Sequence, residues 1–177
     1  MICVGLVGSL DDNSIGNFLY EKLSKFFSVT YLSNGKLLKN GIGDDFLLFD
    51  IDYINSCNFE NCILIIKRHC PINSINNLNR ATVTIVSSDE QDYLKKLSTL
   101  NIKTITCGSL GKDTVTFSSK NDDEIVISLQ RSFNSIFGEE IEPFEIPIKK
   151  APNDDDFMIL AYIALCAEIG IVDKNCH

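Results

Sequence analysis

The N-terminal segment of this chain combines a buried strand, a glycine-containing loop and the start of a helix. Residues 2–7 are almost wholly apolar, which is typical of a parallel strand covered on both faces. The loop that follows carries Asp11 and Asp12 but no lysine. A phosphate-binding loop at this position needs backbone N–H groups and a lysine that converge on the anion. Two carboxylates repel a triphosphate by several kcal/mol at low effective dielectric. We therefore expect a loop that has the shape of a nucleotide pocket but does not bind a nucleotide.

Composition limits the classes of protein to which this chain can belong. With 177 residues and 45% hydrophobic content, the chain is expected to form one globular domain over residues 1–177. A net charge of -8 opposes nucleic acid or an anionic membrane as the main partner. Met1 leads into an apolar strand without a charged leader, and no apolar run is long enough to span a bilayer, so we expect a cytoplasmic protein. The seven cysteines form no Cys-x-x-Cys pair, which argues against a zinc knuckle or a redox dithiol.

Apolar runs of strand length alternate with helical patterns along the chain. We predict helices over 14–27, 89–100 and 154–169, the last one capped by Asn153 and the aspartates after it. Predicted strands cover 2–7, 28–33, 46–51, 62–66, 81–86, 104–107, 114–118, 124–129 and 141–148. The early strands are nearly continuous apolar runs, and the later ones are short and separated by turns. This pattern predicts an α/β fold with three layers, in which a mostly parallel sheet has helices on both faces and an antiparallel extension after Thr114.

Several polar residues follow these strands. Asp11, Asp12 and Asn13 are expected to form a solvated turn that caps the next helix, although the same oxygens could ligate Mg²⁺ or Ca²⁺. Asp50 ends a strand and could line the crevice at the carboxyl edge of the sheet.

The segment around His69 and the loop near Gly108 offer two more candidates. Lys67 and Arg68 are interpreted as a surface basic pair. His69 is the only internal histidine and has no Ser-His-Asp framework that would make it catalytic. The sequence from Gly108 to Asp113 is too short for a phosphate loop and predicts a tight turn.

Four blocks, taken in order, resemble the central domain of the Mur ligases, the ATP-dependent amide ligases that build the peptidoglycan stem peptide. The first, Val4-Gly5-Leu6-Val7-Gly8-Ser9, is similar to the family's Gly-Ile-Thr-Gly-Thr-Asn-Gly-Lys-Thr-Thr up to the point where Leu10, Asp11, Asp12 and Asn13 replace Asn, Gly, Lys and Thr. The other blocks are residues 47–51, residues 83–90 with 105–108, and residues 153–171.

The resemblance implies where a ligand would bind. Asp50 stands at the place of the family's magnesium-binding glutamate, His69 is what remains of a Thr-Asn-x-x-x-Asp-His stretch, and Asp89 follows the strand that leads into Asn-x-Asp-Asp. No catalytic residue is assigned, and a metal site would involve Asp11, Asp12 and Asp50. The candidate ligand-binding residues are Gly8, Ser9, Asp11, Asp12, Asn13, Ser14, Asp50, His69 and Asp89.

These observations favour a stand-alone, degenerate Mur-ligase-like module of bacterial type. We expect it to be non-catalytic, to bind a protein partner or a small polar ligand, and to be linked to cell-wall metabolism. Homo-oligomers are left open. No cofactor is expected: ATP is disfavoured, and a divalent cation is left open. The alternative is an ATP- or metal-dependent enzyme fragment, namely an amide ligase completed by another chain.

Overall fold

The computed structural model describes residues 1–58, 61–78, 82–121, 124–149 and 154–172. The chain divides into two compact units. The first comprises Met1–Val86 and Glu90–Thr104, and the second Ser87–Asp89 and Ile105–His177. Ten strands belong to one mixed, mostly parallel sheet, so the predicted α/β class is confirmed.

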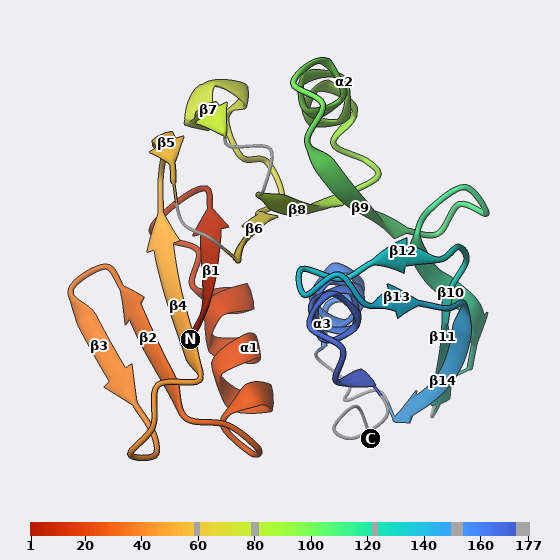
Figure 1. Cartoon of the computed structure of the whole chain (residues 1–177), viewed down its shortest axis with the longest axis horizontal. Coiled ribbons are helices and arrows are strands. Elements are labelled where there is room, and N and C mark those ends of the chain that lie inside the picture. Colours follow the sequence, from red (N-terminus) through yellow and green to blue (C-terminus); the bar gives the residue numbers. More distant parts are fainter. Residues whose placement is uncertain (59–60, 79–81, 122–123, 150–153, 173–177) are drawn as a thin grey trace. The chain divides into compact units, whose positions relative to one another are not determined.

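The first unit has a parallel centre. Its strands follow the order β8-β6-β1-β4-β2-β3, and only the pair β2–β3 is antiparallel (Figure 1). Their bounds are β1 Ile2–Val7, β2 Val29–Ser33, β3 Lys36–Lys39, β4 Phe46–Ile51, β6 Cys62–Ile66 and β8 Val83–Ser87. Because β1, β6 and β8 are buried along almost their whole length, they read as continuous apolar runs in the sequence.

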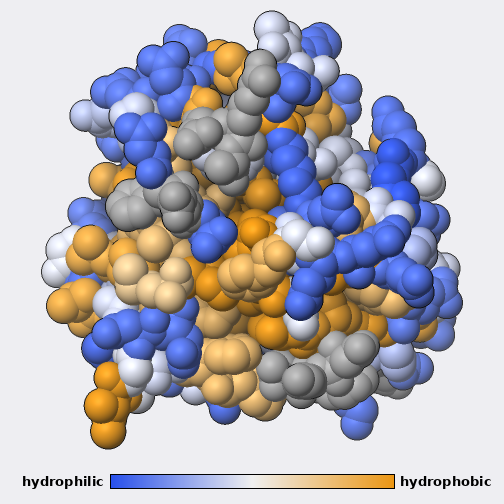
Figure 2. Space-filling model, viewed as in Figure 1, coloured by the Kyte–Doolittle hydropathy of each residue, from blue (hydrophilic) through white to orange (hydrophobic). Residues whose placement is uncertain are grey.

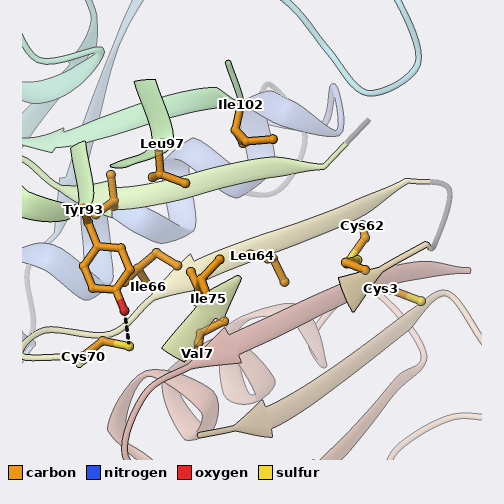
Figure 3. Close-up of a cluster of buried hydrophobic side chains, with 12 residues drawn as sticks. Cys3, Val7, Cys62, Leu64, Ile66, Cys70, Ile75, Tyr93, Leu97 and Ile102 are labelled. Atoms are coloured by element: carbon orange, nitrogen blue, oxygen red, sulfur yellow. Dashed lines mark hydrogen bonds between the residues drawn. The ribbon is translucent and has the colours of Figure 1, made fainter. Parts of the chain in front are cut away.

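Helices cover both faces of this part of the sheet. Helix α1, Ser14–Leu23, packs on β2 and β4 through Ile15, Leu19 and Leu23. On the other face Tyr93 and Leu97 of α2, Gln91–Thr99, join a buried cluster with side chains of β1 and β6 (Figure 3). A small parallel pair, β5 Ile54–Cys57 and β7 Ile75–Leu78, contributes Cys57 and Ile75 to the same cluster, and a 3₁₀ turn, η1 Ile72–Ser74, precedes β7.

The second unit contains the antiparallel extension. The strands β9 Lys103–Gly108 and β10 Val115–Lys120 are parallel, and β11 Glu124–Leu129 and β14 Phe144–Lys149 continue antiparallel. A short hairpin joins β12 Phe133–Asn134 to β13 Glu140–Ile141. Helix α3, Asp156–Glu168, packs on β10 and is buried over nearly all its residues. None of the helices among the described residues is long and apolar enough to cross a membrane.

Several predicted boundaries are corrected. The first helix ends at Leu23, not at residue 27, and the predicted strand 141–148 is two elements, β13 and β14. Asp155 caps α3 by accepting hydrogen bonds from the N–H groups of Phe157 (2.8 Å) and Met158 (3.3 Å). The predicted cap Asn153 and residue 81 of a predicted strand lie outside the described residues.

The loop after Gly108 is the predicted tight turn. The N–H of Asp113 donates to the carbonyl of Leu110 (2.9 Å), and the N–H of Leu110 donates to Asp113 Oδ2 (2.8 Å). Asp113 is buried and also accepts a hydrogen bond from Ser88 Oγ (3.1 Å). Since this aspartate is tied to two partners of its own unit, the turn has a structural explanation.

Candidate functional site

The loop between β1 and α1 begins with a glycine that no other residue could replace without strain. Gly8 has φ +145°, and a Cβ added there would lie 2.9 Å from Cβ of Lys67. Its N–H donates to the carbonyl of Ile51 at the end of β4 (2.9 Å). The absence of a side chain at Gly8 therefore lets the Lys67 stem pass directly against the loop backbone.

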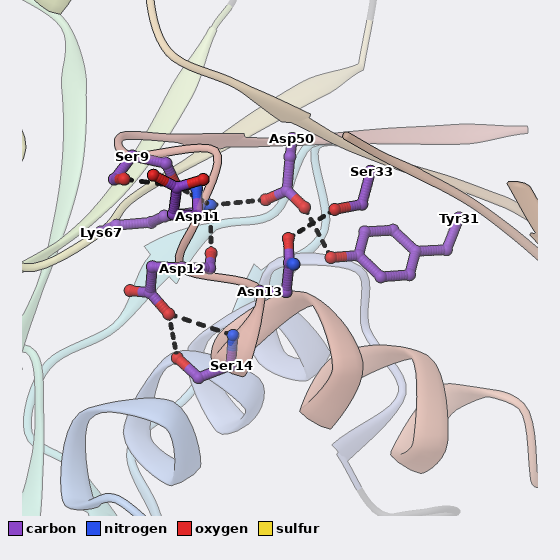
Figure 4. Close-up of polar contacts among 9 residues, drawn as sticks. All are labelled: Ser9, Asp11, Asp12, Asn13, Ser14, Tyr31, Ser33, Asp50 and Lys67. Carbon is purple, nitrogen blue, oxygen red and sulfur yellow. Dashed lines mark hydrogen bonds and ion pairs between the residues drawn. The ribbon is translucent and has the colours of Figure 1, made fainter. Parts of the chain in front are cut away.

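Lys67 directly follows β6, and its ammonium group fills the inside of this loop. Lys67 Nζ donates hydrogen bonds to the backbone carbonyls of Ser9 (2.9 Å) and Asp12 (2.6 Å). It also lies 2.6 Å from Oδ1 of Asp50, and the two side chains are 1% and 0% exposed (Figure 4). Two of the ammonium donors therefore bind backbone carbonyls, and the contact with Asp50 is an ion pair in which Oδ1 accepts no hydrogen bond of good geometry. The loop is therefore closed around a cation that belongs to the chain itself.

Asp50 links this ammonium group to a buried tyrosine. Asp50 is the residue before the last in β4, one of the central strands, and its Oδ2 accepts a hydrogen bond from the hydroxyl of Tyr31 on β2 (2.5 Å). Burial, together with this hydrogen bond, raises the pKa of the Tyr31 hydroxyl above its usual range. A Cβ at Gly16 of α1 would lie 2.0 Å from the Tyr31 oxygen, so this glycine makes room for the phenol.

The last residues of the loop lead into α1, which begins at Ser14. Asp12 Oδ1 accepts hydrogen bonds from the N–H (3.1 Å) and the hydroxyl (2.5 Å) of Ser14. Partial burial raises the pKa of Asp12, but the Ser14 hydrogen bonds and the charge of Lys67 outweigh it and lower the pKa overall. Asn13 accepts from Ser33 Oγ (2.5 Å) and makes no side-chain cap. Of the predicted turn residues, Asp12 accepts the N–H of Ser14, the first residue of the helix, Asn13 stands at the cap position without capping it, and Asp11 is exposed.

The electrostatics of the loop are the reverse of those in a phosphate cradle. In such a cradle, N–H groups and a lysine point toward an anion. Here two carbonyl oxygens and a carboxylate point at an ammonium group that is 1% exposed. An entering phosphate would have to displace a desolvated ion pair and then face carbonyl oxygens. The arrangement holds the chain's own cation inside the loop.

The predicted site residues separate into two groups. The structure brings Gly8, Ser9, Asp12, Asn13, Ser14 and Asp50 together around one loop, with Asp11 on its exposed side. His69 is exposed, and its N–H donates to Oε1 of Glu90 (2.8 Å), not to the loop. Asp89 belongs to the second unit, where its N–H donates to Ser87 Oγ (3.3 Å).

The described residues give no support to a metal site. Over these parts of the chain, no group of three or more histidine, cysteine, aspartate or glutamate side chains could hold a metal ion. Asp50, the central member of the hypothetical set, is already bound by Lys67 and Tyr31.

Lys67 is a site residue that was not predicted from the sequence. A surface basic pair was predicted, but Lys67 is 2% exposed and only Arg68 lies at the surface. A signal was present: Lys67 follows an unbroken run of apolar residues, and Asp50 lies near the end of another central strand. Opposite charges at the carboxyl ends of central strands predict a pair, whereas nothing in the sequence marks Tyr31 or Ser33 as their neighbours.

Comparison with protein-family models finds no match, and no curated protein matches the sequence. Solved structures do match. The MurF ligase from Thermotoga maritima in complex with ADP aligns with a TM-score of 0.57 and 12% identity, over 96% of this chain and 45% of that one. The fold is similar to that of part of the Mur ligases. A UDP-N-acetylmuramate:L-alanyl-gamma-D-glutamyl-meso-diaminopimelate ligase from Neisseria meningitides aligns with a TM-score of 0.64 and 11% identity, over 98% of this chain and 63% of that one.

MurF from Acinetobacter baumannii gives a similar result, with a TM-score of 0.61 and 10% identity over 99% of this chain and 46% of that one. This chain therefore spans between about half and two thirds of the length of these Mur ligases. At such low identity the likeness concerns the fold, and the resemblance read from the four sequence blocks is confirmed at that level.

Proposed function

We propose that this chain is a non-catalytic Mur-ligase-like module that acts by binding a protein partner or a small polar ligand. The observation that carries the proposal is the Lys67 ammonium group, which fills the loop where a Mur-type fold would hold the phosphates of ATP. Two further features support it. Asp12 takes the place of the family's loop lysine. Asp50 forms an ion pair with Lys67, where the family's glutamate would bind a magnesium ion.

A link to cell-wall metabolism is part of the proposal. The neighbours named above are ligases of the MurF and UDP-N-acetylmuramate types, and one of them was solved with ADP. A module that keeps their fold but has a closed loop is suited to regulate or scaffold such enzymes without consuming nucleotide. The similarity of fold suggests cell-wall metabolism as the process, and the closed loop is the reason to expect no ATP-dependent reaction.

The experiment is calorimetric titration of the full chain with ATP and Mg²⁺, combined with an assay of phosphate release. We expect no binding heat at millimolar nucleotide and no turnover above the buffer blank. Micromolar affinity, or turnover that depends on Mg²⁺, would overturn the proposal.

A matched variant separates loop charge from loop geometry. Asp11→Asn with Asp12→Asn removes two negative charges and leaves Lys67 and the carbonyl groups of the loop in place. We expect this variant to ignore ATP as the parent does, because carbonyl oxygens still face the inside of the loop. If the variant binds ATP tightly, charge alone excluded the nucleotide, and the closed-loop argument is wrong.

A further inference from the structure

The outer strand of the first unit presents apolar side chains to solvent. β3 is the last strand in its sheet order, and among the described residues it pairs with β2 alone. In β3 Leu37 is 68% exposed and Leu38 39%, and Leu32 on β2 is 49% exposed. Edge strands usually protect themselves by placing charges along their length. Here the lysines stand only at the two ends, and the middle of the strand is apolar.

The open edge also carries unpaired backbone groups. The turn residues Asn34 and Gly35 have φ +27° and +79°, as in the two-residue hairpin loops that match the twist of a sheet. In such a hairpin, the residues that flank the loop exchange hydrogen bonds, and the pairs then alternate. The pair Leu32–Leu37 is the next one, so the N–H and C=O groups of Leu37, and likewise those of Lys39, point away from β2.

An apolar row leads from this edge into the core. Leu37 is in register with Leu32, which is in register with Phe49 of β4, so the three side chains share one face of the sheet. The row continues through Gly5 to the fully buried Leu64. In Figure 2, hydrophobic side chains lie over part of the region of the strands β2 to β4, next to a hydrophilic patch. An added strand with an apolar residue opposite Leu37 would extend this row and cover its exposed end.

Charge determines which kind of strand fits. Residues 14–40 carry four lysines and a single glutamate, which is a net charge of +3 in a chain whose net charge is -8. Lys36 and Lys39 bracket the two leucines of the edge. Lys39 lies 2.8 Å from Asp44, but both side chains are largely exposed, so this pair is weak and can exchange. A second copy of β3 would bring lysines together, whereas an acidic strand would be attracted.

We propose that the β3 edge binds an extended, acidic segment of a protein partner by strand addition. The segment forms backbone hydrogen bonds with Leu37 and Lys39, places an apolar residue opposite Leu37, and places carboxylates near Lys36 and Lys39. This inference rests on the proposed binding function, and it names the surface and the class of partner.

The probe is a fluorescein-labelled peptide with the core Glu-Val-Val-Glu, which matches the order of charged and apolar residues in β3, compared with its Lys-Val-Val-Lys counterpart by fluorescence anisotropy. We expect saturable binding of the acidic peptide, at least about tenfold tighter than the basic one and weakened by salt. Leu37→Pro removes an outward N–H that β2 does not use, a position where an edge strand tolerates proline. It should weaken binding about tenfold, and Lys36→Glu about threefold. The control Phe137→Ser changes another exposed apolar residue and should have no effect.

Three results would overturn the inference. The first is equal binding of the two peptides. The second is binding that Leu37→Pro leaves unchanged while circular dichroism shows a native fold. The third is a dimer in sedimentation that Leu37→Pro abolishes, because a second copy of the chain would then occupy the edge. Failure of the proposed function has a different readout, since it would appear as ATP binding in the calorimeter. A protein that ignores both ATP and the acidic peptide refutes only the inference about the edge.

Discussion

Removal of the Lys67 charge measures how strongly the loop depends on its internal ammonium group. Lys67→Met keeps most of the length and the apolar stem of the side chain but leaves the Asp50 carboxylate, which is 0% exposed, without its cation. Loss of one partner of a buried ion pair costs about 3–5 kcal/mol. In a chain of this size each kcal/mol shifts Tm by about 2–4 °C, so we expect Tm to fall by about 6–20 °C.

The assays are thermal unfolding, which gives Tm, and urea denaturation, which gives the free energy of unfolding; both are followed by circular dichroism, which suits a chain without tryptophan. The control is the double variant Lys67→Met with Asp50→Asn, in which no charge is left buried. Because the neutral amide removes the uncompensated carboxylate, the double variant should be more stable than the sum of the two single changes predicts. The expected coupling is about 1–3 kcal/mol.

Two results would refute this reasoning. The first is a loss of less than about 1 kcal/mol for Lys67→Met, which would place the ammonium group in solvent. The second is additivity within about 0.5 kcal/mol in the double variant, which would show that Lys67 and Asp50 do not interact.

Three other predictions concern the same loop. Gly16→Ala pushes a Cβ into the Tyr31 hydroxyl, 2.0 Å away, and should lower the free energy of unfolding by about 1–3 kcal/mol in urea, whereas an unchanged midpoint would contradict the packing. The raised pKa of Tyr31 means that its stabilising contribution is complete below the unfolded value of about 10 and is lost as pH rises above it. The stability difference between the parent and Tyr31→Phe should therefore shrink at alkaline pH, and a constant difference would refute the pKa shift. The lowered pKa of Asp12 gives the opposite pH dependence. Asp12→Ala should be less stable than the parent above about pH 4, and the difference should vanish at lower pH, as measured by acid titration of both proteins.

The parallel centre of the fold could be predicted because strands that are buried on both faces consist almost wholly of apolar residues. Strands such as β1 and β6 are continuous apolar runs, and their predicted bounds are confirmed. β3, β5 and β7 were missed because their residues are short, partly polar runs without alternation. β5 and β7 also pair with each other across a long stretch of sequence, and no local pattern reveals such a pairing.

The place of the loop could be predicted, but the group that fills it could not. The strand–loop–helix pattern placed the loop at Gly8 correctly, while the loss of a phosphate cradle, read from the acidic residues, stays a prediction. The group that fills the loop comes from Lys67, far along the chain, and only the parallel pairing of β1 with β6 brings it there. Contacts between distant segments depend on sheet order, which the sequence pattern leaves open.

The most direct test of the closed loop is a crystal structure of the chain grown with millimolar ATP and Mg²⁺. Our account predicts density for the Lys67 ammonium group between the carbonyls of Ser9 and Asp12 and the carboxylate of Asp50, with no triphosphate in the loop. A triphosphate bound by the loop N–H groups, with Lys67 turned away from Asp50, would contradict the account.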